Sequence, residues 1–274
     1  MRIAILNDLH LDLNSIEMKY NLVPELIEGL KSKNPDLIII AGDIANYASD
    51  SVRVIDKIQE KLAKQVLFIP GNHDIWTSKE VAIKGIDSWE NYNFFSKHSS
   101  SLIDKPYHIN DEYVVIGDMG WYDYSFAPET IPIYTMKSRK KSLWSDGKYA
   151  IWNMDDQKLM KRMLDKFQKM FEEHKNKKVI FVNHFVPYKE FITYSHNNNQ
   201  WNLTNGFLGS ENLGWLIDQY PNIKYVIFGH THKRYGKVNR KNKTVICNPL
   251  GYVGEWTTNN FLKELEKAIT IIEV

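Results

Sequence analysis

Short apolar runs recur along the chain, and most of them are separated by longer stretches in which apolar residues follow a helical spacing. The runs are rich in β-branched and aromatic residues and are too short for helices, so they predict strands. The six predicted strands cover residues 2–6, 37–41, 66–69, 114–116, 179–182 and 225–228.

The longer stretches predict amphipathic helices at residues 23–33, 51–63, 155–174 and 210–220. Ser51 is expected to cap the second of these helices, because a serine oxygen can accept a hydrogen bond from a free amide at a helix start. Strands that alternate with helices predict an α/β fold with a largely parallel sheet covered by helices. The stretch 233–248 has the pattern of a hairpin, so the later strands are expected to include antiparallel pairing.

Residues 117–153 are the one long interruption of this alternation. They are rich in aromatic residues and lack clear periodicity, and loops of this length are usually functional or disordered. The length of 274 residues and the hydrophobic content of 43% suffice for a large core. We therefore expect a single domain over residues 1–274, with an aromatic-rich insertion at about 117–153.

Composition excludes several classes of protein. The 35 basic and 33 acidic residues give a net charge of +2, which is too balanced to predict a stable nucleic-acid partner or a charged membrane surface as partner. Cys247 is the only cysteine, which excludes an internal disulfide and a Cys-based zinc site. The first ten residues carry charge too early for a signal peptide, and no apolar run approaches the roughly 20 residues that span a bilayer. A cytoplasmic protein without a membrane partner is expected.

The candidate chemistry lies directly after the predicted strands. Aspartate, asparagine and histidine residues follow five of the predicted strands. Five of the nine histidines of the chain lie at these strand ends. The carboxyl ends of parallel strands share one edge of a sheet, so these side chains are expected to converge there. The five motifs are Asn7-Asp8-Leu9-His10, Gly42-Asp43, Gly71-Asn72-His73-Asp74, Asn183-His184 and Gly229-His230-Thr231-His232.

The spacing of these motifs favours a metal site. Asp8 and His10 are two residues apart, as are His230 and His232, and in extended backbone both members of such a pair point to the same side. Oxygen and imidazole ligands without thiolate suit Mn, Fe, Zn, Co or Ni better than calcium. Each motif alone also occurs as a structural turn, but five in succession, each at a strand end, favour metal binding.

This ordered series resembles the signature of the calcineurin-like metallophosphoesterases, and it extends from Asp8 to His232. The resemblance implies a four-layer αββα sandwich of two mixed sheets flanked by helices, with two divalent metal ions at the strand ends. It implies that His73 is not a ligand but stands beside the substrate phosphate. It also implies the ligands: Asp8, His10 and His232 for one metal, Asn72, His184 and His230 for the other, and Asp43 for both.

These implied roles agree with the chemistry of phosphate ester hydrolysis. A bridging carboxylate can hold two cations about 3.5–4 Å apart, and such cations produce a metal-activated hydroxide near neutral pH. Mn²⁺ is the cation expected to support activity in vitro. His73 is the candidate general acid, or an electrostatic stabiliser of the leaving group. Asp74 is expected either to anchor its loop or to cap a helix.

The sequence departs from the protein-serine/threonine phosphatase branch of the family. Pro70, Asn46 and Tyr47 stand where that branch carries two arginines and an aspartate that grip and orient a phosphate monoester. The sequence therefore favours the bacterial-type phosphodiesterase side of the family and a small phosphodiester, such as a nucleotide or cyclic nucleotide. Two alternatives stay open: a phosphomonoesterase that acts on a small metabolite, and a non-catalytic metal-binding scaffold. Asn46 is expected to hydrogen-bond His73.

Two aromatic segments, residues 120–152 and 191–208, are candidate walls of the substrate site. Trp121 and Tyr122 in the first and Tyr194 in the second are expected, with Asn46, to contact substrate, by stacking on a nucleobase where the side chain is aromatic. The alternative is that these aromatic side chains pack as an accessory core. Lys233 and Arg234 follow the last motif and either border the cleft or belong to a solvated hairpin face.

Overall fold

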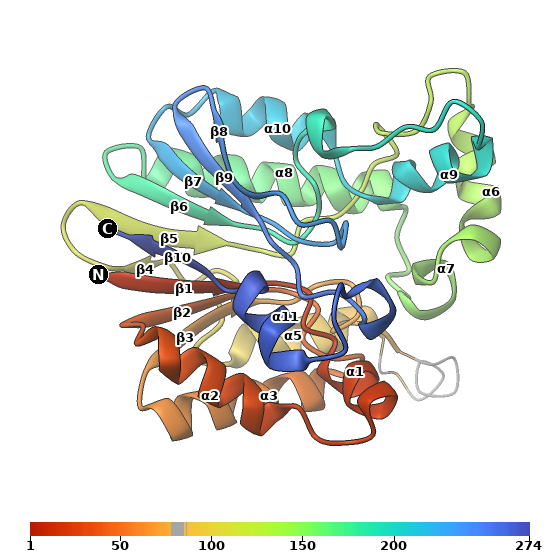
Figure 1. Cartoon of the computed structure of the whole chain (residues 1–274). Coiled ribbons are helices and arrows are strands. Elements are labelled where there is room, and N and C mark those ends of the chain that lie inside the picture. The colour runs from red at the N-terminus through yellow and green to blue at the C-terminus, as the bar shows by residue number, and fades with distance from the viewer. Residues whose placement is uncertain (78–84, 86) are drawn as a thin grey trace.

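The computed structural model describes residues 1–77, 85 and 87–274, and Figure 1 shows two packed sheets with helices on their outer faces. One sheet of the described residues has four strands in the order β10-β1-β2-β3. The strands β1, β2 and β3 are parallel, and β10 pairs with β1 in antiparallel orientation. The bounds are Arg2–Leu6 for β1, Leu37–Ala41 for β2, Gln65–Ile69 for β3 and Thr270–Glu273 for β10.

The other sheet has six strands among the described residues, in the order β4-β5-β6-β7-β9-β8. Its four middle strands are parallel, and the edge strands β4 and β8 are antiparallel to their neighbours. The hairpin predicted over 233–248 is confirmed as β8 and β9. The bounds are Tyr107–His108 for β4, Tyr113–Gly117 for β5, Lys178–Val182 for β6, Ile223–Ile227 for β7, Gly236–Arg240 for β8 and Lys243–Cys247 for β9.

Helices cover the outer face of each sheet and also lie beyond the carboxyl ends of the strands (Figure 1). The four-stranded sheet is covered by α1 (Leu11–Met18), α2 (Val23–Lys33), α3 (Ala48–Leu62), α5 (Ser88–Lys97) and α11 (Phe261–Ala268). The six-stranded sheet is covered by α8 (Asp156–Glu173) and α10 (Glu211–Asp218). Beyond the strand ends lie α6 (Ile133–Leu143), α7 (Asp146–Tyr149) and α9 (Asn199–Thr204). Short 3₁₀ turns occur at Lys189–Phe191, Asn205–Phe207 and Val253–Glu255.

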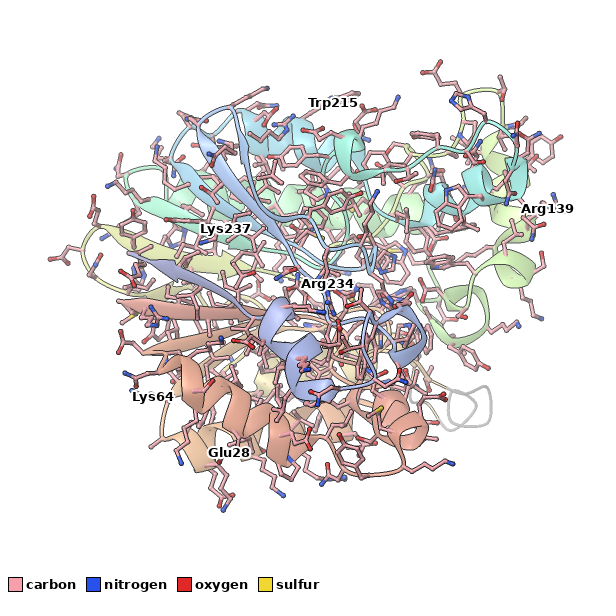
Figure 2. All side chains as sticks on the ribbon, viewed as in Figure 1. Glu28, Lys64, Arg139, Trp215, Arg234 and Lys237 are labelled. Atoms are coloured by element: carbon pink, nitrogen blue, oxygen red, sulfur yellow. The ribbon has the colours of Figure 1, made fainter. Side chains whose placement is uncertain are left out.

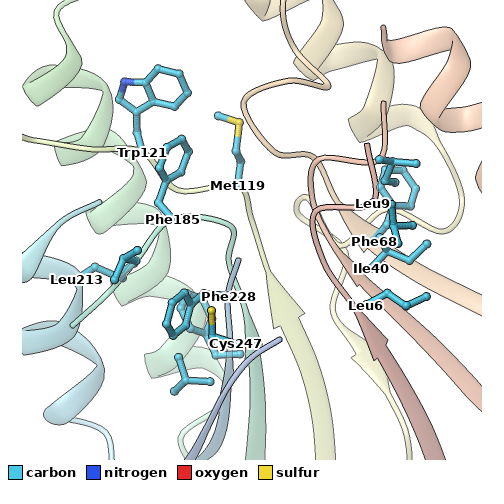
Figure 3. Packing of buried hydrophobic residues seen from close by; sticks show 14 of the residues in the cluster. Leu6, Leu9, Ile40, Phe68, Met119, Trp121, Phe185, Leu213, Phe228 and Cys247 are labelled. Carbon is cyan, nitrogen blue, oxygen red and sulfur yellow. The ribbon is translucent and has the colours of Figure 1, made fainter. Parts of the chain in front are cut away.

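The alternation of side chains along the strands explains the four layers. In β1, Ile3 and Ile5 belong to the hydrophobic cluster between the sheets, whereas Ala4 and Leu6 face the helices. Figure 3 shows members of the second hydrophobic cluster, which covers the helix-facing sides of both sheets: Leu6, Ile40 and Phe68 lie on one sheet, and Trp121, Phe185 and Leu213 lie beside the other. Both faces of each sheet are buried, which is why the strands read as continuous apolar runs. The predicted αββα sandwich is confirmed.

One helix start differs from the prediction. The helix α3 begins at Ala48, one turn before the predicted start, with Tyr47 at its N-cap. Ser51 is buried within the helix and donates a hydrogen bond to Asp74 Oδ1 over 2.6 Å, so the prediction that it caps the helix is wrong. Each helix among the described residues is too short or too polar to cross a lipid bilayer.

Candidate metal centre

The structure brings the strand-end motifs of both sheets together. Their histidine and aspartate side chains form two groups whose potential ligand atoms lie within 4.8 Å of one another. We call them the first position (Asp8, His10 and His232, with Asp43) and the second position (His184 and His230, with Asp43 and the adjacent Asn72). Asp43 belongs to both groups, as the resemblance implies.

The first position joins the ends of β1, β2 and β7. The Nε2 atoms of His10 and His232 are 2.9 Å apart, and His10 Nε2 is 3.7 Å from Asp43 Oδ2. His232 Nε2 is also 3.7 Å from Asp8 Oδ1. Four donor atoms from three strand ends therefore converge in a space that suits one cation.

The second position joins the ends of β2, β3, β6 and β7. His184 Nε2 is 3.3 Å from Asp43 Oδ2, 3.1 Å from Asn72 Oδ1 and 3.2 Å from His230 Nδ1. The oxygen and nitrogen donors of four residues thus meet around His184 Nε2. This set is less charged than the first, because an amide takes the place of a second carboxylate.

The remote ring nitrogens fix which nitrogen of each imidazole faces the centre. His184 Nδ1 lies 2.9 Å from the Ala41 carbonyl, His230 Nε2 lies 3.2 Å from the Phe207 carbonyl, and His232 Nδ1 lies 2.8 Å from Glu255 Oε2. A carbonyl or carboxylate accepts a hydrogen bond, so each of these remote nitrogens carries the proton. The inward nitrogen then presents a lone pair, which is the tautomer that a metal ligand needs.

The backbone brings the ligands together by a different route from the predicted one. Asp8, His10, Asp43, His230 and His232 all have positive φ, between 42° and 70°. The expectation that extended backbone orients the Asp8–His10 and His230–His232 pairs is wrong, because these residues lie in left-handed turns. Residues other than glycine adopt this conformation at a cost, and such outliers cluster at functional sites.

Two glycines allow the carboxylates to sit close to the neighbouring backbone. A Cβ on Gly71 would lie 2.2 Å from Asp43 Oδ1, and a Cβ on Gly229 would lie 2.2 Å from Asp8 Oδ2. Both contacts are shorter than any side chain tolerates, and the second would push the Asp8 carboxylate out of the first position. The glycines that precede the ligands are therefore required by close approach.

The polar atoms of the centre fit a pair of divalent cations. Asp8 Oδ2 is buried and has no hydrogen-bond partner among the described residues. Burial raises the pKa of Asp8 to about 6, and burial also lowers the pKa of His10. Burial opposes ionisation of Asp43 as well, but His184 and His73 outweigh it and hold the pKa of Asp43 well below its usual range. A cation at each position would satisfy these donors, and the oxygen and nitrogen set suits a transition metal.

Asp74 anchors the loops that carry two of these ligands. Its carboxylate accepts hydrogen bonds from the backbone amides of Gly71 and Asp43, each over 2.7 Å, and from those of Ile44 and Ala45 over 3.0 and 3.2 Å. It therefore ties the loop after β3 to the loop after β2. Of the two roles expected for Asp74, the structure shows the loop anchor.

His73 lies beside the centre, with its ring 4.6 Å from the ring of His10, centroid to centroid. Its Nδ1 is 2.7 Å from Asn46 Oδ1, as expected, and its Nε2 is 3.3 Å from the Tyr252 hydroxyl. Its ring lies 3.6 Å from the ring of Trp76, centroid to centroid. Burial lowers the pKa of His73 to about 4, so the ring is neutral near pH 7.

A cavity of about 380 Å³ opens from the metal centre. Asp43, Asn72, His73, His230 and His232 line one end. The remaining wall comes from the end of α6 and the two residues that follow it, from the segment 191–208, and from the loops after β7 and β9. The side chains of that wall include Leu143, Trp144, Phe191, Thr193, Trp201, Asn205, Leu208, Lys233, Tyr235, Tyr252 and Glu255.

The predicted substrate contacts are placed elsewhere. Trp121 and Tyr122 are fully buried, stack on each other at 4.6 Å and do not line the cavity, so the prediction that they contact substrate is wrong. Figure 3 shows Trp121 beside Phe185 in the core, which is the accessory-core alternative. Tyr194 donates a hydrogen bond to the Phe126 carbonyl, and neither Tyr194 nor Asn46 lines the cavity.

Sequence reasoning missed two groups that the structure brings to the centre. The Tyr252 ring lies 4.4 Å from the ring of His10 and 4.6 Å from that of His232, and Glu255 holds His232 Nδ1. Both follow β9, which is parallel to β7, so its carboxyl end lies at the same sheet edge. The rule that found the other motifs would have found this one, had β9 been read as a parallel strand.

The basic residues after the last motif divide into two kinds. Lys233 Nζ lies in the cavity wall, 3.3 Å from Thr193 Oγ1 and 5.2 Å from the ring centre of Tyr235. Arg234 instead pairs with Glu264 over 2.6 Å and donates to the carbonyls of Pro249 and Leu250. Figure 2 shows Arg234 near the middle of the molecule and Lys237 farther out on the hairpin. Only Lys233 of the two residues singled out borders the cleft.

Two known proteins are similar to this chain over most of its length. A protein named as a probable cyclic nucleotide phosphodiesterase, from Coxiella burnetii, is 25% identical over 244 residues, which are 86% of this chain and 77% of that protein. The crystal structure of a phosphopantetheinyl hydrolase from Mycobacterium tuberculosis matches with a TM-score of 0.74 and 17% identity, over 98% of this chain and 95% of that one. That structural likeness shows the fold alone.

The sequence model of the calcineurin-like phosphoesterases matches residues 1–234, which include every predicted ligand. Members of that family are hydrolases that depend on two metal ions. The chain therefore belongs to the calcineurin-like phosphoesterase family and is a metal-dependent hydrolase of phosphate esters.

Proposed function

We propose that this enzyme hydrolyses a small phosphodiester, with a nucleotide or cyclic nucleotide as the first class to test. Asp8, His10 and His232 would hold one divalent cation, and Asn72, His184 and His230 the other, with Asp43 between them. The cations would supply charge on the phosphoryl oxygens and lower the pKa of the attacking water. Mn²⁺ is the ion of choice for assays in vitro.

His73 is the proposed proton donor to the leaving oxygen. Asn46 Oδ1 holds its Nδ1 proton, so Nε2 points toward the cavity, where the Tyr252 hydroxyl is 3.3 Å away. Burial keeps the ring neutral without substrate. An anionic phosphate beside it would raise its pKa, so that the ring takes up from solvent the proton that it later donates. An amide such as Asn46 stabilises imidazolium less than a carboxylate would, so the ring can release that proton readily.

The shape and charge of the cavity carry the preference for a diester. Beyond the metal centre the cavity continues along Leu143, Trp144, Phe191 and Leu208, which gives room for a second ester group. Among the described residues that line it, Lys233 is the one lysine or arginine. A diester bears a single negative charge, which two cations and one lysine balance without the arginines that grip a monoester dianion in the phosphatase branch.

The test is hydrolysis of two artificial substrates by metal-stripped protein that is titrated with Mn²⁺. Bis-p-nitrophenyl phosphate and p-nitrophenyl phosphate share the same leaving group, so their ratio of kcat/KM reports the diester preference. We expect turnover that requires Mn²⁺ and favours the diester, and we expect cyclic nucleotides to compete with it. A preference for the monoester would redirect the search to small phosphorylated metabolites.

A further inference from the structure

We infer that Asp146, in the aromatic-rich insertion, is a positioning residue that orients Asn72 toward the second metal position, an inference that rests on the proposed function. Asp146 is the first residue of α7 and is fully buried. Its Oδ1 accepts a hydrogen bond from Asn72 Nδ2 over 2.9 Å. Because the amide nitrogen is held there, Asn72 Oδ1 faces His184 Nε2, and the oxygen is left as the ligand atom.

The same carboxylate orders two further side chains of the cavity. Asp146 Oδ1 also accepts from Trp76 Nε1 over 2.6 Å, and Asp146 Oδ2 accepts from Trp144 Nε1 over 3.0 Å. Trp76 lies against His73, and Trp144 lies 5.7 Å from the ring of His230. The Asp146 carboxylate thus contacts the proposed ligand Asn72, Trp76 beside the proposed acid, and Trp144 in the cavity wall.

Asp146 is fully buried and accepts hydrogen bonds from three side chains. Burial raises its pKa, and the hydrogen bonds from Asn72 and Trp76, together with Lys140, oppose that effect. The insertion therefore contributes to the second position although it supplies no ligand.

The test compares Asp146→Ala with a matched variant of a second buried aspartate, Asp156→Asn. Asp156 accepts from Trp121 Nε1 over 2.7 Å and from Lys140 Nζ over 2.6 Å, but none of its hydrogen-bond partners among the described residues is a proposed ligand. Mn²⁺ binding is measured by calorimetry, and paired Mn²⁺ ions are detected by electron paramagnetic resonance. Neither readout depends on turnover, so a failure of the phosphodiester proposal does not affect them.

We expect Asp146→Ala to bind one ion with wild-type affinity and the other about 10–100-fold more weakly, which is the usual effect of removing a group that orients a ligand. Asp156→Asn should bind both ions as the wild type does. Wild-type binding of both ions by Asp146→Ala would overturn the inference. An equal loss in Asp156→Asn would also overturn it, since the effect would then reflect general loosening of the insertion.

Asp146→Asn keeps the inference testable if the alanine variant does not fold. An asparagine oxygen can still accept from Asn72 and Trp76, so the second ion should be retained. Its amide group would meet the Trp144 indole N–H, two donors face to face, so Trp144 should move and KM should rise while kcat changes little. Loss of the second ion as complete as in Asn72→Ala would overturn the inference.

Discussion

The two metal positions share Asp43 but are supported by different parts of the chain. At the first position, His232 is oriented by Glu255, which follows β9, and every group comes from a loop at a strand end. At the second position, Asn72 is oriented by Asp146, which lies in α7 of the insertion. Among the described residues, the first position is thus built by loops at the strand ends, whereas the second also depends on the aromatic-rich segment 117–153.

This difference indicates where the specificity of the enzyme can change. The insertion reaches both the second position, through Asp146, and the cavity wall, through Leu143 and Trp144. A change in the insertion can therefore alter metal occupancy and substrate fit together. The first position is isolated from such changes because, among the described residues, none of the hydrogen bonds made by the side chains of Asp8, His10 and His232 involves the insertion.

Removal of the Asp43 side chain should affect both metal positions equally. Asp43→Ala deletes the one side chain common to both positions, so we expect the loss of both ions. Activity should fall to background, a decrease on the order of 10⁶-fold or more if the enzyme accelerates its reaction by a typical factor. Hydrolysis of bis-p-nitrophenyl phosphate and ion counting by calorimetry measure the two effects. A variant that still binds two ions would show that Asp43 is not shared.

His73 should separate catalysis from metal binding at either position. We expect His73→Gln to bind two ions and to lose about 10²–10⁴-fold in kcat, the usual contribution of a general acid. The loss should be smaller for a substrate whose leaving group needs no proton, which comparison of p-nitrophenyl and alkyl phosphodiesters would reveal. Loss of an ion in this variant would instead make His73 a ligand.

Substitution of Glu255 should weaken metal binding at the first position, as substitution of Asp146 should weaken it at the second. Glu255→Ala removes the acceptor that orients His232, so we expect one ion to bind about 10–100-fold more weakly and the other to bind unchanged. The double variant Glu255→Ala with Asp146→Ala should weaken both ions, with nearly additive effects. Calorimetric titration with Mn²⁺ gives both affinities. If both single variants weakened the same ion, the two positions would not be supported separately.

Lys233 should affect substrate binding and neither metal position. Its ammonium group lies in the cavity wall, so we expect Lys233→Met to raise KM by about tenfold, the worth of one hydrogen bond to a charged group, at nearly constant kcat. Lys237→Met is the matched control, because Lys237 lies on the same hairpin and donates to the Ile271 carbonyl outside the cavity. Equal KM values for the two variants would show that Lys233 does not contribute to substrate binding.

Much of the fold and of the centre follows from local patterns in the sequence. The apolar runs predict the strands because both faces of each sheet are buried, and the strand-end motifs predict the centre because parallel strands share an edge. Ser51 was misplaced because α3 begins a turn earlier and its hydroxyl binds Asp74 instead. The helix Leu11–Met18 was missed because it buries only Leu11 and Asn14 and shows little amphipathic pattern.

The surroundings of the centre were harder to predict, since they depend on contacts between distant segments. Trp121 and Tyr122 have the composition of a stacking site but are buried in the core of the insertion, and composition does not distinguish these two arrangements. Asp146 is 74 residues from Asn72, and no motif marks it. Glu255 could have been predicted, because it follows β9, which is parallel to β7. The hairpin pattern of β8 and β9 indicated only the antiparallel pairing of β9.

The most direct test of two positions that share Asp43 is anomalous diffraction from crystals of the wild-type enzyme soaked in Mn²⁺. We predict two peaks about 3.5–4 Å apart, one on each side of the Asp43 carboxylate, with Asn72 Oδ1 beside the peak nearer His184. A single peak in the centre, or two peaks that do not both contact Asp43, would contradict the account.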